Sequence, residues 1–515
     1  MKLRRVRGTL QLGLAFSWLL GSALGLPAAT VRSSESASWL GLTLGQSLLQ
    51  NEPEESHGHS AGHATEHKEE PAAGHGHGGH HGVEAAGHGG HGEADHGHGG
   101  HHHPVPTHEA TALSLMLMGS VAFIMNIFYL VNWNDPDIRL GSWKVLSMTV
   151  SIFSSVLLYA SAKTVVLHFL PAYLAIPVQL GLYFSLYCIL QVALYAIKGR
   201  SERLVIATGT IFAHIVAFSA MYVGAEIQLL QSPWGVKGSN AILVALGTAG
   251  LLYGLSLVSD RIRTHFAEMD GTVDEAEELW MEQVEDAEND IIALAVGFLT
   301  MQAVRFYLCG ESVPFHAHDQ PPEKVTQTQI NELFVAAVFF GVLTCVIAML
   351  QEVLPAAQHA GEQTRRLFHL ATNVSSMAMA WCLLFWGDWQ LFELGLDVRN
   401  RVSGCILLGL VLTMLSLLAI FVLDFLADNG RMGKKALRSL ILALGVLVGF
   451  SWEKAFDVAM EDIAHSNFGL GIPPSVKVLG QTAILCVVVI PAWYKYILPH
   501  AIEDMHPVKE DADKP

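Results

Sequence analysis

Residues 403–426 read SGCILLGLVLTMLSLLAIFVLDFL, a run with a single charged side chain. A helix needs about 20 predominantly apolar residues to cross a bilayer, so this run is long enough to span a membrane. Comparable runs recur from Ala110 onward, and we count eleven: 110–131, 143–162, 172–197, 204–224, 241–259, 291–308, 332–350, 369–387, 403–426, 437–452 and 476–498. The sequence therefore predicts an all-α fold, a polytopic membrane bundle of about 11 transmembrane helices.

The composition excludes several classes of protein. With 51% hydrophobic and 15% charged residues among 515, the chain is too apolar for an ordinary soluble protein. Its net charge of −17, without a basic patch, argues against nucleic acid as a partner. The six cysteines form no CxxC motif, so neither a disulfide framework nor a cysteine zinc site is expected. The expected partner is the lipid bilayer.

The N-terminus resembles a signal peptide. Residues 1–7 read MKLRRVR and are followed by an apolar stretch that ends in small residues, which predicts a signal peptide over residues 1–25. An uncleaved signal anchor is the alternative. Either interpretation places residues 26–108 in the lumen or outside the cell.

Histidine dominates this segment: sixteen of the chain's 26 histidines lie between His57 and His108. Gly, His, Ala and Glu prevail there with little aliphatic bulk, so we expect a disordered segment. Imidazole binds zinc and other divalent transition metals, and it titrates near neutral pH, which predicts a weak metal collector or a pH sensor. A solubilising tail is the alternative. The candidate ligands are His57, His59, His75, His77, His96, His98, His101, His102 and His103.

A second candidate metal cluster follows the sixth apolar run. His316, His318 and Asp319 lie in a loop predicted on the same side as the His-rich segment. A cation concentrated by that segment could pass to these ligands, although an ordinary surface loop explains them equally well. We infer no firm cofactor.

The loop charges predict the orientation. Thirteen Lys and Arg residues fall in the loops assigned to the cytosol and seven in the opposite loops, as the positive-inside rule requires. The helical bundle, residues 109–499, then has an outer N-terminus, a cytosolic acidic loop at 260–290 and a cytosolic acidic tail at 500–515. We expect a multi-pass protein of the secretory pathway or plasma membrane.

Runs two to eleven group into five helical hairpins, an irregular internal repeat. The first helix of each carries an ionisable residue near its outer end: Lys163, Glu226, Arg305, Asp388 and Glu453. Charges inside membrane helices are costly and usually pair or line an aqueous path. We therefore expect pairs such as Lys163 with Glu226 and Arg305 with Asp388. Anchoring at the membrane interface is the alternative.

Two further residues are candidates for a transport path. Gln302 lies one helical turn before Arg305 and on the same face. His214 lies near the middle of an apolar run, where it could relay protons or bind a cation, or simply form a buried hydrogen bond. Separately, the pairs Gly250–Gly254 and Gly445–Gly449 predict close helix packing.

Catalytic signatures are missing from the sequence. It contains no Walker A loop, GxSxG, HExxH or dinucleotide fingerprint, so we expect neither an enzyme nor an ATP-driven pump. The order of signal peptide, His-rich segment and helical bundle resembles some zinc/iron-permease transporters. That family has eight spans and a His-Asn-x-x-Asp motif, which the nearest string, HLATN at 369–373, does not match. We therefore assign no family.

These observations favour a secondary transporter or channel for a cation, either a divalent metal ion or a proton. The His-rich segment would act as its outer metal collector or pH sensor. The alternative is a polytopic scaffold or signalling protein that transports nothing and whose charges only anchor it.

Overall fold

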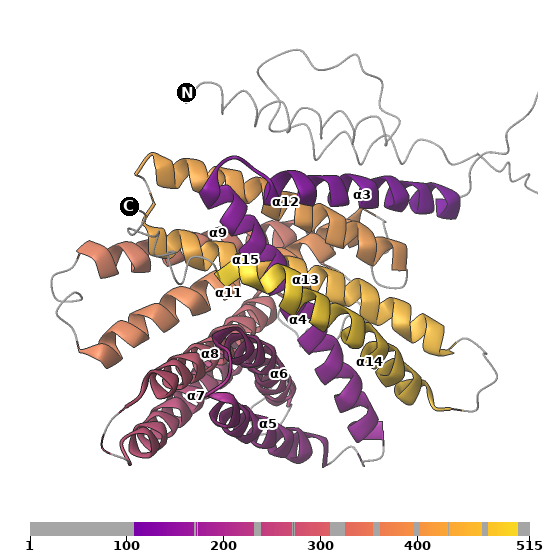
Figure 1. The fold of residues 1–515 in the computed structure, drawn as a ribbon. Helices are drawn as coiled ribbons and strands as arrows, with labels where there is room; N and C mark the ends of the chain where they lie inside the picture. Colours follow the sequence, from indigo (N-terminus) through magenta and orange to yellow (C-terminus); the bar gives the residue numbers. More distant parts are fainter. Residues whose placement is uncertain are drawn as a thin grey trace, which may run out of the picture. The chain divides into compact units, whose positions relative to one another are not determined.

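Helices make up the regular structure of the described part of the chain (Figure 1). The structure, a computed structural model, describes residues 108–502 except 169–170, 172–173, 231–237, 270, 272, 310–324, 354–360, 395–401, 431 and 466–471. Its helices are α3 (His108–Val131), α4 (Pro136–His168), α5 (Ala175–Ile197), α6 (Glu202–Leu229), α7 (Gly238–Ala267), α8 (Glu275–Cys309), α9 (Gln327–Val353), α11 (Glu362–Glu393), α12 (Val402–Asp428), α13 (Lys434–His465), α14 (Pro474–Ala492), the π-helical turn η2 (Trp493–Ile497) and α15 (Leu498–Ile502).

Ten of the described helices, α4 to α9 and α11 to α14, are long and apolar enough to cross a membrane. Each covers one predicted run, which confirms the all-α, multi-pass class. The eleventh helix, α3, covers the first predicted run, and its described side chains begin at Leu117. The predicted signal peptide (1–25) and, except for His108, the His-rich segment (26–108) lie outside the described residues, as do residues 503–515 of the acidic tail.

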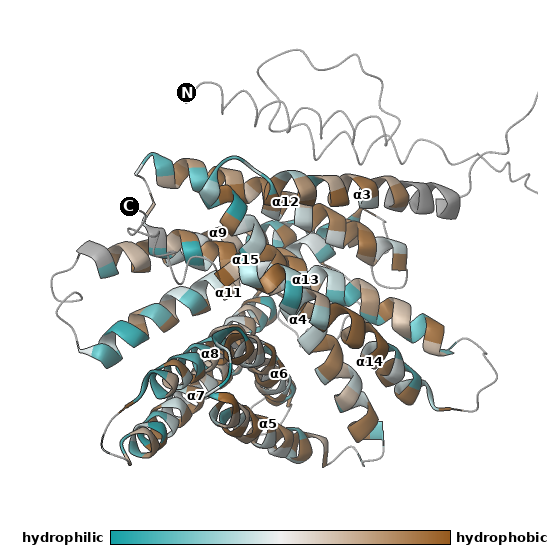
Figure 2. Cartoon of the chain, viewed as in Figure 1, coloured by the Kyte–Doolittle hydropathy of each residue, from teal (hydrophilic) through white to brown (hydrophobic). Residues whose placement is uncertain are grey.

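Five helices form a closed inner ring. Helix α4 packs against α6, α6 against α8, α8 against α11, α11 against α13, and α13 returns to α4. Between 61% and 78% of the apolar window of each inner helix is buried, against 11–44% for α5, α7, α9, α12 and α14. The inner helices are therefore the first helices of the five predicted hairpins, and the second helices surround them. Figure 2 shows hydrophobic residues predominating along outer helices such as α5 and α14.

The inner helices run in parallel. Ser155 of α4 donates a hydrogen bond to the carbonyl of Ile211 in α6, and Lys163 of α4 contacts Tyr222 further along both helices. Helices α11 and α13 show the same order. Ser439 in the first half of α13 donates to Asn373 in the first half of α11, and Lys454 in the second half of α13 donates to Asp388 in the second half of α11. Similar ends of the five inner helices therefore lie together.

Each outer helix packs most extensively on the next inner helix in the chain. Helix α5 covers α6, α7 covers α8, α9 covers α11, and α12 covers α13, while α14 closes the cycle on α4. This arrangement explains why the repeat is irregular in sequence. The packed unit consists of the second helix of one hairpin and the first helix of the next. It therefore includes the loop between the two hairpins, whose length varies.

Glycines allow close approach at the inner ring. A Cβ at Gly445 would lie 2.8 Å from the Cβ of Met148 in α4, and one at Gly449 would lie 3.2 Å from the Cβ of Ile152. The predicted close packing is confirmed for this pair. It is wrong for Gly250 and Gly254 of the outer helix α7, where no described atom lies within 4 Å, because their face of α7 does not meet another helix.

Aromatic side chains fill the middle of the ring. Phe450 of α13 contacts Phe218 of α6, with ring centroids 5.1 Å apart, although these helices are not neighbours in the ring. Trp381 of α11 lies 4.0 Å from Phe450 and 4.9 Å from Phe298 of α8. All four side chains are buried. We call Phe218, Phe298, Trp381 and Phe450 the aromatic layer.

The segment predicted as an acidic loop, 260–290, contains two helix ends. Helix α7 continues to Ala267, and α8 begins at Glu275, so only residues 268–274 connect them. Gly271 takes a positive φ of 87° in that turn, which glycine adopts without steric cost. As a result, the acidic residues 275–290 form the first turns of α8 and lie on the same helix as the apolar run 291–308.

Candidate functional site

The ionisable residues predicted at the outer ends of five helices all lie on the inner ring, at the ends that lie together. We define the charged ring as these residues plus two neighbours on α13: Lys163, Glu226, Arg305, Asp388, Glu453, Lys454 and Asp457. On α6, α8, α11 and α13, the residues of the charged ring follow the aromatic-layer residue of the same helix in the direction of the chain.

A short ion pair joins α11 and α13. The ammonium of Lys454 lies 2.6 Å from Oδ1 of Asp388, which is only 4% exposed. Because a buried carboxylate without a counter-charge is costly, the pair holds these two helices together at the charged ring. The sequence predicted that Asp388 pairs with Arg305, and the structure brings Lys454, the residue after Glu453, into contact with it.

Lys163 lies on α4, which neighbours both α13 and α6 in the inner ring. It is 7% exposed, and its ammonium lies 3.5 Å from the centre of the Tyr222 ring, a cation–π contact. Glu226 and Asp457 are the carboxylates that attract it. The attraction between Lys163 and Glu226 is consistent with the pair that the sequence predicted. These contacts bring α4, α6 and α13 together.

Arg305 of α8 is 3% exposed and is held by its own helix and by α11. Its Nη1 donates to Oε1 of Gln302 at 2.8 Å, and its guanidinium lies 3.9 Å from the ring centre of Phe385 and 5.4 Å from that of Trp389. The predicted proximity of Gln302 and Arg305 is therefore present.

His214 lies apart from the charged ring. It is buried in α6, twelve residues before Glu226, which corresponds to about 18 Å along a helix. Its Nδ1 has no hydrogen-bond partner among the described residues. The structure thus places the other predicted path residues together and leaves His214 at another depth.

A second buried charge cluster, the Glu288 cluster, was not predicted. Glu288 of α8 is 1% exposed and accepts hydrogen bonds from Arg263 of α7 at 2.7 Å, Tyr187 of α5 at 2.6 Å and Gln191 of α5 at 3.1 Å. Arg366 of α11 approaches it at 3.3 Å. This carboxylate therefore links one inner helix to two outer helices and to its neighbour in the ring.

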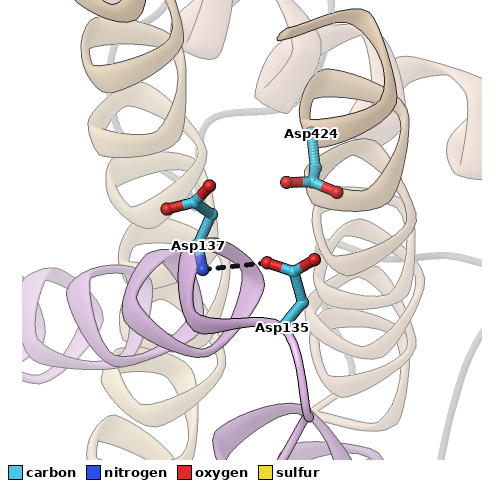
Figure 3. A group of neighbouring side chains, drawn as sticks. All are labelled: Asp135, Asp137 and Asp424. Carbon is cyan, nitrogen blue, oxygen red and sulfur yellow. Dashed lines mark hydrogen bonds between the residues drawn. The ribbon is translucent and has the colours of Figure 1, made fainter. Parts of the chain in front are cut away.

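Acidic side chains also meet near the start of α4 (Figure 3). Ligand oxygens of Asp135, Asp137 and Asp424 lie within 4.8 Å of one another. Asp135 accepts a hydrogen bond from the Asp137 amide at 3.1 Å and precedes Pro136, the first residue of α4, so it caps that helix. Helix capping accounts for Asp135, and the partial positive charge of a helix N-terminus favours Asp137 in the first turn. The three oxygens could hold a hard cation, but the helix start explains two of them without one.

The predicted metal ligands cannot be placed. The His-rich segment's nine candidate histidines and the cluster of His316, His318 and Asp319 lie outside the described residues. The zinc or other divalent metal expected there stays a prediction.

Comparison with known proteins assigns no relative to this chain. It matches no protein-family model, no curated protein and no solved structure.

Proposed function

We propose that this protein is a secondary transporter or channel for a cation, either a divalent metal ion or a proton, and that the charged ring is its binding site. The observation that carries the proposal is the gathering of seven ionisable residues on five parallel membrane-spanning helices. Charged residues at such positions are rare and commonly mark ion pathways.

Burial supports this role over interface anchoring. A charge that anchors a helix end extends to the headgroup region and stays hydrated. Lys163, Arg305 and Asp388 are instead at most 7% exposed and contact residues of neighbouring inner helices. Glu226, Glu453 and Asp457 are only partly buried, so the described side chains do not seal the ring completely.

In this proposal the His-rich segment, residues 26–108, acts on the outer side as a metal collector or pH sensor. Flexible imidazoles bind divalent metals weakly and exchange them quickly, which suits delivery rather than storage. His316, His318 and Asp319 would receive the cation. Zinc is the metal that this donor set fits most readily.

Flux through proteoliposomes tests the proposal. The full chain and a variant without residues 30–108 would be compared for movement of zinc, manganese, calcium and protons. We expect cation movement in both, with uptake at low metal concentration weakened by the deletion. An Asp388→Asn variant should lose most of the flux, and a Glu282→Gln variant, changed at an exposed site on α8, should keep it.

A scaffold or signalling protein gives the opposite result. It would move no cation under any gradient, even if its His-rich segment still bound metal. Asp388→Asn would then alter only stability.

A further inference from the structure

A row of polar side chains lies on the buried face of α5. Gln179, Tyr183, Tyr187 and Gln191 follow one another at intervals of four residues, so they form one ridge along the helix. We call these four residues the α5 row. The first three are 1%, 3% and 7% exposed, and Gln191 is partly buried. Three of the five buried residues of α5 are therefore polar, although this outer helix exposes large apolar side chains elsewhere.

One end of the α5 row meets the Glu288 cluster. Tyr187 donates to Oε1 of Glu288 at 2.6 Å, and the side-chain amide of Gln191 donates to the same oxygen at 3.1 Å. At the other end, Gln179 lies about one helical turn after Ala175, the first residue of α5. The row therefore extends about 18 Å along α5, from near the start of the helix to a buried carboxylate.

The two members of the row that are farther from Glu288 lack hydrogen-bond partners. Both amide atoms of Gln179 and the hydroxyl of Tyr183 are buried without one among the described residues. Buried polar groups almost always have a partner, which can be an ordered water molecule. Unpartnered polar atoms on successive turns of one helix thus point to a ligand that forms hydrogen bonds.

Tyr183 lies between Gln179 and the Glu288 cluster. Its ring centre is 6.2 Å from that of Tyr187, and its hydroxyl is close enough to both Glu288 and Tyr187 to interact with them electrostatically. However, the hydroxyl forms no hydrogen bond with either residue. Polar groups separated by more than hydrogen-bond distance can be bridged by water, which is nearly as favourable as a direct bond. A water molecule beside Tyr183 would therefore connect it to the Glu288 cluster.

Water suits the α5 row better than an ion does. A glutamine amide and a tyrosine hydroxyl each donate and accept hydrogen bonds, as water does. The row carries no charge at neutral pH, because tyrosine ionises near pH 10 and glutamine does not ionise, so it offers an ion no counter-charge. A buried water molecule typically forms about three hydrogen bonds, and the row supplies donors and acceptors on each of its turns.

From the spacing, the burial and the unpartnered atoms together, we propose that a file of water molecules lies along the α5 row and leads from the start of α5 to Glu288. Helix α5 packs on α6 and α8 from outside the inner ring, so the file does not cross the aromatic layer. Beyond Glu288, Arg263 contacts Asp260, whose side chain is 51% exposed. The inference goes beyond the proposed function and does not depend on it, because it concerns a path outside the charged ring.

Hydroxyl-radical footprinting of the full chain in detergent micelles tests the inference. An X-ray pulse forms the radicals from water, and they label the side chains next to that water. We expect Tyr183 and Tyr187 to be labelled several-fold faster than Phe298, after correction for the intrinsic reactivity of each residue type. Phe298 is the matched internal control, because it is an equally buried aromatic side chain that lies in the aromatic layer.

A double variant tests whether the row itself holds the water. Gln179→Leu combined with Tyr183→Phe removes the unpartnered atoms while nearly preserving the volume of both side chains. We expect the labelling of Tyr187 to fall to the level of Phe298. Tyr195→Phe is the control, since Tyr195 of α5 is 47% exposed and does not belong to the row, and it should leave the labelling of Tyr187 unchanged.

Three outcomes would overturn the inference. The first is wild-type labelling of Tyr183 and Tyr187 that is no faster than that of Phe298. The second is labelling of Tyr187 that persists in the double variant, because water would then reach it without the row. The third is a double variant that melts well above the wild type, since replacing dry, unpartnered polar groups by apolar ones is stabilising. Because the wild type alone shows whether the row is hydrated, a variant that fails to fold does not remove the test.

Discussion

Replacing Glu288 by glutamine removes the carboxylate charge at the centre of the Glu288 cluster while nearly preserving its shape. The change leaves Arg263 and Arg366, whose side chains are 3% and 7% exposed, without their buried counter-charge. Removing one partner of a buried ion pair costs about 3–5 kcal/mol. Each arginine keeps a longer contact of 3.4 Å, Arg263 with Asp260 and Arg366 with Glu285. We therefore expect the lower end of that range, about 3 kcal/mol.

The free energy of unfolding in detergent, measured by reversible denaturation, checks this value. Glu282→Gln, an exposed change on the same helix, is the control and should cost less than about 0.5 kcal/mol. Replacing Glu288, Arg263 and Arg366 together by methionine should recover much of the loss, since no buried charge then remains. A Glu288→Gln variant within about 1 kcal/mol of the wild type would show that water or the half-exposed carboxylates already compensate the arginines, and our reasoning would be wrong.

Three other changes test packing, charge and the ring axis. Gly445→Ala should lower the free energy of unfolding by about 1–3 kcal/mol through overpacking. Gly250→Ala should be neutral or stabilising by up to about 1 kcal/mol. Thermal denaturation of the two variants measures this difference. The hydrogen bond to the Glu277 carboxylate raises the pKa of Lys198, so the pair stabilises the fold below the ordinary lysine pKa and loses this effect as the pH rises above it. The melting difference between Lys198→Met and wild type should therefore stay constant from neutral pH to about 9. Phe450→Ala should cost about 3–5 kcal/mol and raise cation leak in proteoliposomes; destabilisation without leak would argue against a path through the aromatic layer.

Hydrophobic length was sufficient to predict the helices, and the placement of one charge near the same end of alternate helices was sufficient to predict that these charges lie together. The orientation that the loop charges indicate stays a prediction. Mean hydropathy carries a further signal that went unused. The inner helices α11 and α13 have the lowest values, 1.3 and 1.5, and the outer helices α9 and α12 the highest, 2.8 and 2.9, whereas the other six helices lie between 1.7 and 2.1 and are not separated. Helices that face lipid must be apolar on most of their surface, while inner helices can carry polar side chains that find partners.

The Glu288 cluster could not be foreseen in the same way. Its members lie at the edges of apolar runs, where a charge normally reaches water, and Glu288 belongs to a stretch dense in acidic residues. Only the continuation of α8 through residues 275–290, and the packing of α5, α7 and α11 around it, distinguishes this glutamate from its exposed neighbours. The prediction for Gly250 and Gly254 fails for a related reason, because small-residue spacing permits close packing but does not determine which helix face is covered.

Helix α8 contributes a residue to the Glu288 cluster, to the aromatic layer and to the charged ring. Glu288 and Arg305 lie about 25 Å apart along it at 1.5 Å per residue, and Phe298 lies between them in the aromatic layer. Under the proposed function, a cation bound at the charged ring would meet the packed aromatic layer before it reached the level of the Glu288 cluster. Passage along the axis requires the contact between Phe218 and Phe450 to open, which means separating helices α6 and α13. The Glu288 cluster ties α5, α7 and α11 to α8, so these helices are expected to move together during that separation. Within the proposed function, the packing of the aromatic layer therefore favours a transporter that changes conformation over an open channel.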